Sequence, residues 1–393
     1  MARLEDCYNY FHLREEAKRR LPKWVFEFID RGAEDEIAIK HNRLALDRIK
    51  LRNRAMVDIS NRKLGTTLFG KEVSLPVAIA PTGSAGLCYY NGEVELAKAA
   101  KAKNVPFVMG TASFTPMEKI AEVGGNLWFQ LYLWERRELS HDLLRRASAV
   151  GYDVLLVTAD FGLRANREYN RRNGFSNPFK PTYPAVRDIM LKPGWFAKVA
   201  LPYLMNGGIP KQANNPPESK HLPQLAMRAE TVTWDDFARL RDVWPGKILI
   251  KGIVRADDAV KAMANGADGV VVSNHGGRNL DSTVASIDAL PEIVREIGNK
   301  GTVLLDSGVR RGSDMVKAFA LGAHGVLAGR FPLWGVASGG AAGGERALEI
   351  LRSEYENHLA FVGARSIDEL SPDVLASDAS LSGHLPPGRS LNN

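Results

Sequence analysis

A histidine and an arginine stand three residues apart in a glycine-rich stretch, residues 270–281, which reads V-V-V-S-N-H-G-G-R-N-L-D. The β-branched run at its start predicts a strand buried on both faces, as in a parallel sheet. The Gly-Gly pair lets the backbone turn sharply and approach a ligand closely. His275 then lies where α/β proteins place their chemistry, with Arg278 close enough to bind an anion. The two could form a proton acceptor and a carboxylate or phosphate clamp, although a tight turn with a solvated arginine gives the same pattern.

Apolar runs alternate with helical segments from Leu75 onward, which is the pattern of repeated strand–helix units. The predicted strands are Leu75–Pro81, Val105–Gly110, Leu127–Leu133, Val154–Ala159, Lys247–Gly252, Gly269–Ser273, Thr302–Asp306 and Gly325–Ala328. The predicted helices include Glu93–Lys103, Met117–Val123, Leu139–Ala149, Asp257–Asn265, Ile287–Ile297, Asp314–Leu321 and, last, Glu345–Phe361. Repeated units of this kind predict an α/β fold, a (β/α)8 TIM barrel, with an open doubly wound sheet as the alternative.

The chain divides into three parts on this interpretation. Residues 1–74 form an N-terminal helical preface that covers one end of the barrel, and residues 75–371 form the barrel itself. Residues 372–393 are rich in Ser, Asp, Gly and Pro and are expected to be a loose tail. A long loop after the fourth strand, residues 161–233, overhangs the mouth as a lid, a membrane-contact segment or a poorly ordered excursion.

Polar residues follow every predicted strand, where the carboxyl ends meet at one face of the barrel. In strand order the candidates are Thr82; Gly110; Gln130 and Tyr132; Thr158, Asp160 and Arg167; Lys251; Ser273, His275 and Arg278; Asp306, Ser307, Gly308 and Arg310; and Gly329 with Arg330. Buried polar groups are costly without partners, so the whole set indicates a ligand. The last two loops are the usual phosphate site of such barrels. Lys251 fits either the anionic edge of a flavin or, as the weaker alternative, a Schiff base of an aldolase or isomerase.

Composition excludes some other classes. The 393 residues carry a net charge of +7, which favours anionic ligands, but no basic stripe with interleaved aromatics indicates nucleic acid. The two cysteines have no metal-ligand spacing, so no metal site is expected. With no apolar signal segment and no run long enough to cross a bilayer, a cytoplasmic protein is expected.

Four motifs, taken in this order, resemble the FMN-dependent 2-hydroxy acid dehydrogenase and oxidase family. They are G-A-E-D-E at 32–36, W-F-Q-L-Y at 128–132, S-N-H-G-G-R-N-L-D at 273–281 and D-S-G-V-R-R-G at 306–312. The resemblance extends from residue 21 to about residue 371. It implies oxidation of an L-2-hydroxy acid to the 2-oxo acid, with FMN as cofactor and oxygen or a quinone as electron acceptor. Homotetramers among relatives imply a homo-oligomer by analogy.

The resemblance also implies a role for each candidate residue. His275 is similar to the base that removes a proton while a hydride equivalent reaches flavin N5, and Asp160 to the carboxylate that orients it. Tyr132 is similar to a partner of the substrate oxygen, and Arg167 and Arg278 to the carboxylate clamp. The remaining candidates resemble the FMN site: Lys251, Gln130, Thr158, Ser273 and Gly110 at the flavin, Asp306 at the ribityl chain, Gly308, Arg310, Gly329 and Arg330 at the phosphate, and Thr82 and Ser307 as further cofactor-binding residues.

Departures from the family pattern bear on the substrate. Phe28 stands where the family usually has a tyrosine that touches the substrate carboxylate, and Gly110 replaces a common serine. Ala112 stands where glycolate oxidase has a bulky aromatic residue, and with Gly83 it resembles the mandelate dehydrogenase branch. The sequence therefore predicts a bulky, aryl substrate, with lactate or a larger tailoring substrate as alternatives.

An apolar patch at Trp195–Leu204 in the long loop mixes aromatic residues with Lys192, Lys198 and Lys211. This mixture is typical of an interfacial segment, so peripheral contact with the inner face of the membrane is one interpretation. Packing of the patch onto the barrel or a neighbouring subunit is the other.

Overall fold

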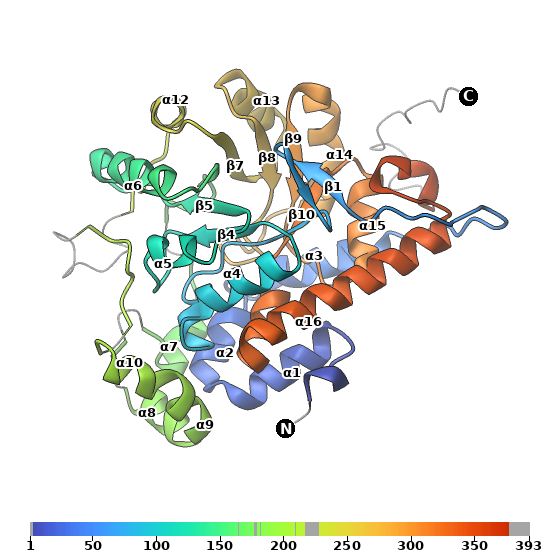
Figure 1. Ribbon diagram of the computed structural model, residues 1–393. Coiled ribbons are helices and arrows are strands. Elements are labelled where there is room, and N and C mark those ends of the chain that lie inside the picture. Colours follow the sequence, from blue (N-terminus) through green and yellow to red (C-terminus); the bar gives the residue numbers. More distant parts are fainter. Residues whose placement is uncertain are drawn as a thin grey trace.

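Eight short parallel strands form a closed barrel in the computed structural model, which describes residues 3–163, 165–176, 179–180, 182–208, 210–216 and 228–376 (Figure 1). The strands are β3 (Val77–Ile79), β4 (Phe107–Gly110), β5 (Leu127–Leu131), β6 (Val154–Thr158), β7 (Lys247–Ile253), β8 (Gly269–Val272), β9 (Thr302–Leu305) and β10 (Gly325–Ala328). Each pairs with the next in chain order, and β10 returns to pair with β3. The predicted (β/α)8 barrel is confirmed, and the open sheet is excluded.

Helices surround the barrel and bury their apolar faces on it. They are α4 (Gly92–Ala102), α5 (Met117–Ala121), α6 (Arg137–Ala149), α12 (Trp234–Val243), α13 (Ala256–Ala264), α14 (Ser286–Ile297), α15 (Gly312–Ala320) and α16 (Arg330–Val362). The last helix begins 15 residues before its predicted start at Glu345. It bends sharply at Gly339 and Gly340, whose backbone is not helical. The glycine-rich run in its first half weakens the helical signal, so the sequence pattern shows only the second half.

A hairpin that the sequence analysis missed closes one end of the barrel. Its strands are β1 (Thr66–Leu68) and β2 (Lys71–Val73), which pair antiparallel around Phe69 and Gly70. Leu68 and Val73 join the apolar residues inside the barrel, and the Phe69 ring contacts Trp128 at 5.4 Å between centroids. This plug lies beside the amino end of β10, so the opposite end of the barrel is left for a ligand.

The preface contributes a short 3-10 turn, η1 (Leu4–Asp6), and the helices α1 (Tyr10–Arg20), α2 (Lys23–Asp30) and α3 (Ile37–Arg48). Helix α1 packs on α16, and α2 lies at the carboxyl ends of the strands (Figure 1). The helices of the preface therefore lie over the open end of the barrel, whereas its hairpin lies at the other end.

The long loop after β6 is folded in the part that the structure describes. It forms α7 (Glu168–Asn173), α8 (Tyr183–Met190), α9 (Pro193–Trp195), a π-helical turn, η3 (Phe196–Ala200), and α10 (Leu201–Met205). Trp195 donates from Nε1 to the carbonyl of Leu87 at 2.8 Å, which fastens the loop to the turn η2 (Ala85–Leu87). These described residues are therefore not a poorly ordered excursion.

The predicted loose tail is ordered at its start. After η6 (Ile367–Glu369), the turn η7 (Pro372–Val374) buries Val374 and Leu375 against the core. Residues 377–393 lie outside the described residues, and the domain boundaries at 74/75 and 371/372 remain a proposal. No helix in the described part of the chain is both long enough and apolar enough to span a bilayer.

Candidate active site

A cavity of about 670 Å³ opens at the carboxyl ends of the barrel strands, within the size range of small-molecule sites. Its lining brings together fifteen of the seventeen predicted site residues: Thr82, Gly110, Gln130, Tyr132, Thr158, Arg167, Lys251, His275, Arg278, Asp306, Ser307, Gly308, Arg310, Gly329 and Arg330. The other two, Asp160 and Ser273, lie directly behind the lining, where they bond to His275 and Lys251.

His275 is held between a carboxylate and a phenol. Its Nδ1 lies 2.9 Å from Asp160 Oδ1, and its Nε2 lies 3.1 Å from the Tyr132 hydroxyl. A carboxylate accepts hydrogen bonds only, so Nδ1 carries the proton and Nε2 is left as the acceptor. The His275 backbone has a positive φ of 58°, which aims the ring into the cavity from the turn after β8. The arrangement can therefore take a proton at Nε2.

Asp160 reaches His275 across the intervening strand β7. A side chain at Gly252 would place its Cβ within 2.4 Å of the Asp160 Cγ atom, so only glycine leaves room for this contact. Burial opposes ionisation of Asp160, but attraction and hydrogen bonding from His275 outweigh it and lower the pKa of the carboxyl group. Burial also lowers the pKa of His275 below its ordinary value of 6.5, against the opposing effect of Asp160.

These pKa shifts predict the pH dependence of the reaction. A base must be unprotonated, and a pKa of His275 below 6.5 keeps it so at neutral pH. We therefore expect the acid limb of the kcat/KM profile to be centred below pH 6.5. Asp160→Asn removes an attraction that raises the pKa of His275, so the acid limb of the kcat/KM profile of this variant should move to lower pH. If the acid limb of the unmodified protein were centred above pH 7, the assignment of His275 as the base would be contradicted.

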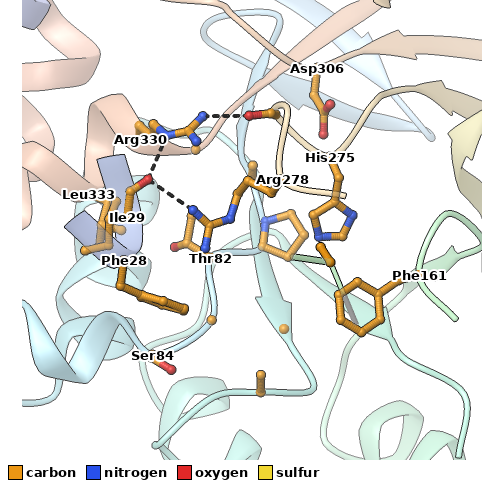
Figure 2. A pocket seen from close by; sticks show the side chains of 18 of the residues that line it. Phe28, Ile29, Thr82, Ser84, Phe161, His275, Arg278, Asp306, Arg330 and Leu333 are labelled. Carbon is orange, nitrogen blue, oxygen red and sulfur yellow. Dashed lines mark hydrogen bonds between the residues drawn. The ribbon is translucent and has the colours of Figure 1, made fainter. Parts of the chain in front are cut away.

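Two arginines face the same space. Arg167 donates from Nε and Nη2 to the carbonyl of Arg278, at 3.2 and 2.8 Å. Arg278 donates from Nη1 to the carbonyls of Ile29 and Arg31, so the preface positions its guanidinium (Figure 2). Burial and then the charge of Arg167 lower the pKa of Arg278 to about 10. Two buried like charges side by side are stabilised by an anion, and a carboxylate fits a guanidinium fork.

Lys251 is buried in a polar cluster beneath the cavity. Its Nζ lies 2.8 Å from Asp306 Oδ2 and donates to Ser273 Oγ at 2.8 Å. Burial opposes its charge, but Asp306 and Asp160 outweigh burial and raise the pKa of the ammonium group. A Schiff base needs a neutral amine, so this environment disfavours the aldolase alternative. A fixed ammonium group suits a ligand edge that gains negative charge.

The loops after β9 and β10 form the predicted phosphate end of the cavity. Ser307 donates to Asp306 and accepts from the backbone N–H of Gly276, and positive φ angles at Ser307 and Gly308 curve the loop. Arg330 bonds to the carbonyls of Ile29 and Gly276 (Figure 2). Arg310 lies over the Tyr10 ring. The phosphate role of these two arginines remains a prediction.

The residues present fit FMN in three respects. The hydroxyl oxygen of Thr82 is buried on the cavity wall and has no hydrogen-bond partner among the described residues, which is the state expected of a group that bonds a ligand. Gln130 donates to Thr158 Oγ1 at 2.8 Å, so two more polar groups stand at the strand ends. The glycines at 110, 308 and 329 line the cavity without side chains, so the backbone itself can approach a ligand. No cluster of metal-ligating side chains occurs among the described residues.

The cavity residues that the sequence analysis missed include Phe161, Phe175 and Arg228. Phe175 stacks on Phe28 with 4.0 Å between ring centroids, and Phe161 lies 5.6 Å from His275. Arg228 stacks over Tyr132. All three belong to the long loop, whose length was noted but whose fold has no periodic signal. In the sequence, Arg228 is a single basic residue between Met227 and Ala229, and this pattern does not indicate a site.

Comparison with known proteins identifies the family. The model of the FMN-dependent dehydrogenases matches residues 17–377. The chain is 38% identical over 378 residues to (S)-mandelate dehydrogenase of Pseudomonas putida, covering 95% of each chain. It is 38% identical over 381 residues to an L-lactate oxidase of a Nostoc species, covering 95% of this chain and all of the relative. The crystal structure of the monotopic membrane protein (S)-mandelate dehydrogenase matches with a TM-score of 0.89 at 37% identity, over 95% of this chain and 100% of that one. This chain belongs to the FMN-dependent dehydrogenase family.

Proposed function

We propose that this protein oxidises an L-2-hydroxy acid to the 2-oxo acid with His275 as the base. The observation that carries the proposal is the contact of His275 with both Asp160 and Tyr132, beside Arg167 and Arg278. A proton acceptor next to a carboxylate clamp matches the two polar groups of a 2-hydroxy acid. The family's FMN cofactor and the names of the relatives support the same reaction.

Each residue has one task in this proposal. Arg167 and Arg278 bind the substrate carboxylate, which places the hydroxyl group between Tyr132 and His275. Nε2 of His275 takes the proton, and the Asp160 carboxylate stabilises the imidazolium that forms. FMN, when bound, accepts the two electrons of the oxidation. The ammonium group of Lys251 supports negative charge at that side of the cavity.

The space beside the reacting groups supports a bulky, aryl substituent. Ala112 and Gly83 leave that wall small, and a Cβ at Gly83 would already lie 3.2 Å from the Ala112 Cβ, which is tighter than ordinary contact. Phe28, Phe161 and Phe175 line the cavity with ring faces, which suit a planar apolar group. Mandelate, named for the first relative, is an acid of this kind, and lactate is the smaller alternative.

Anaerobic bleaching of the flavin tests the proposed function. The purified protein should be yellow, and an excess of an L-2-hydroxy acid should reduce its flavin absorbance without oxygen. A panel of lactate, 2-hydroxybutyrate, mandelate and phenyllactate should give the fastest bleaching with the aryl acids. Bleaching by none of these acids and by none of their dicarboxylic counterparts would overturn the proposal and leave a larger tailoring substrate as the alternative.

Phe28→Tyr is expected to tighten the binding of small hydroxy acids. The Phe28 ring lies under Arg278, with 5.0 Å between its centroid and the guanidinium carbon, so a hydroxyl group would reach the region of the substrate carboxylate. A hydrogen bond to a charged group contributes about 1.5–3 kcal/mol, so the affinity for lactate should rise about 10-fold or more. The dissociation constant of the unreactive analogue oxalate measures this change in affinity. An unchanged value would show that Phe28 does not mark the specificity of this chain.

We also propose that the loop helices form the peripheral membrane contact. Exposed apolar side chains gather on α8 and α10 and on the residues that join them, with Met190 76%, Leu191 68% and Met205 75% exposed. The structure divides the predicted patch, because Trp195 and Val199 are buried whereas Phe196 and Leu204 face outward. The helices extend from the barrel beside its open end (Figure 1). The membrane-bound relative with a known structure supports this proposal.

Acidic substitutions on this face test the contact. Met190→Glu with Met205→Glu should shift the protein from the membrane fraction to the soluble fraction, because two charges would enter the interface. Leu44→Glu, on the exposed face of α3, is the matched control and should leave the distribution between the membrane and soluble fractions unchanged. The flavin should still bleach in the parent protein, in the double variant and in the control variant. A parent protein found wholly in the soluble fraction at low salt, and not bound by anionic vesicles, would contradict the contact and favour oxygen or a soluble carrier over membrane quinone as acceptor. The homotetramer remains a proposal, which the molecular mass in solution tests.

A further inference from the structure

Arg228 is fixed to the barrel beside the proposed catalytic residues. It lies in the segment that returns from the long loop to the barrel, where it pairs antiparallel with Trp134. The next residue, Ala229, donates its backbone N–H to the carbonyl of Leu133 at 2.9 Å. These bonds attach the segment to the chain just after Tyr132, so the position of Arg228 is set by the scaffold rather than by a free loop.

The Arg228 guanidinium stacks on two aromatic rings at the reaction site. Its central carbon lies 3.8 Å from the centroid of the Tyr132 ring and 4.4 Å from that of Phe161. Both rings are neighbours of His275, through the Tyr132 hydroxyl at 3.1 Å and the Phe161 ring at 5.6 Å (Figure 2 shows Phe161 beside His275). Stacking engages the faces of a guanidinium, whereas its N–H groups point outward in its plane. Arg228 also lines the cavity.

The part of the cavity formed by the long loop is rich in positive charge and in donors. Arg171, Lys180, Asn170, Ser176 and Gln212 line it together with Arg228. Among the described lining residues Asp306 is the only carboxylate, and it pairs with Lys251. Burial lowers the pKa of Arg167, and the charge of Arg228 lowers it further, so the two guanidinium groups face the same space. One substrate carboxylate occupies Arg167 and Arg278 in the proposed function.

We propose that Arg228 is a specificity-determining residue that binds a second anionic group, carried on the substituent of the 2-hydroxy acid. The substrate class is then a dianionic 2-hydroxy acid, such as a dicarboxylate. This inference rests on the proposed function, because it takes Arg167 and Arg278 as the site of the first carboxylate. The aromatic rings hold the apolar part of the substituent, and the stacked guanidinium meets the charge at its far end.

Two pairs of acids matched in shape test the inference. They are (S)-mandelate with its 4-carboxy derivative, and (S)-2-hydroxybutyrate with (S)-malate. Anaerobic flavin reduction gives kcat/KM for each, and perturbation of the flavin absorbance by the 2-oxo acids gives dissociation constants. The parent should prefer the dianionic member of at least one pair by about 10- to 100-fold, the contribution of a charged hydrogen bond. Arg228→Met should abolish this preference, and Arg228→Lys should keep part of it.

A control variant accompanies the test, and the result that overturns the inference differs from the result that overturns the proposed function. Arg172→Met, which removes an exposed arginine of α7 that pairs with Glu168, should leave every preference unchanged. A parent that oxidises the monoanions as well as the dianions would overturn the inference and leave the proposed function intact. Equal losses on both members of each pair in Arg228→Met would also overturn it, because Arg228 would then act only by supporting Tyr132. No bleaching by any 2-hydroxy acid would overturn the proposed function itself.

Discussion

Replacing His275 by alanine is expected to lower turnover of a 2-hydroxy acid by about 10²- to 10⁴-fold, while FMN stays bound. The loss follows from the position of Nε2, which is the acceptor atom that the Asp160 contact leaves facing the Tyr132 hydroxyl and the cavity. Cofactor binding should survive because Lys251, Gln130 and the loops after β9 and β10 do not depend on the imidazole.

Stopped-flow reduction of the flavin separates the two effects in this variant. The rate of bleaching reports the chemical step, and the flavin absorbance per polypeptide reports cofactor content. His12→Ala, on the exposed side of α1, is the control for a histidine outside the cavity and should match the parent. Bleaching of His275→Ala at the parent rate would show that the imidazole is not the base.

Lys251→Met is expected to destabilise the FMN-free protein by about 3–5 kcal/mol, because it leaves the Asp306 carboxylate buried without its counter-charge. The two side chains are only 5% and 9% exposed, and their charged atoms are 2.8 Å apart. Removing both charges should cost much less, so Lys251→Met combined with Asp306→Leu should recover most of the lost stability. The same single variant should bind FMN weakly.

Urea unfolding of the three FMN-free proteins, followed by circular dichroism, measures the difference directly. Using protein without FMN keeps the loss of a cofactor contact out of the result. Lys247→Met is the matched control, since Lys247 pairs with Asp268 at the exposed start of the same strand. If the single variant were as stable as the double variant, the buried pair would not be the source of the effect.

The sequence predicts the barrel well because its strands are buried on both faces. Such strands are mostly apolar, and a polar residue or a glycine directly follows β8, β9 and β10, so β8 and its motif are visible without a structure. The hairpin β1–β2 is too short for an alternation of apolar and polar residues to be seen. The first half of α16 is hidden by glycines at 335 and 343, which let the two halves of the bent helix touch.

The candidate site could be predicted as a set of residues but not as a set of contacts. His275 and Asp160 are 115 positions apart, and only the barrel's closure with Gly252 between them brings the side chains together. Arg228 could not be predicted, because its place depends on the return of an irregular segment to the edge of the mouth. The same holds for the stacking of Phe175 on Phe28.

The hydrogen bonds between the preface and the end of the barrel have a consequence for biosynthesis. Arg330 binds the carbonyl of Ile29 across 301 positions, and Trp334 binds the Tyr10 hydroxyl across 324. Helix α1 therefore lacks its main partner, α16, until the residues after β10 have been made, and contacts this distant in sequence form slowly. The apolar face of α1 remains exposed throughout that interval, so a molecular chaperone is most needed at this helix. The mouth that holds FMN closes last, which makes cofactor loading a late step of maturation.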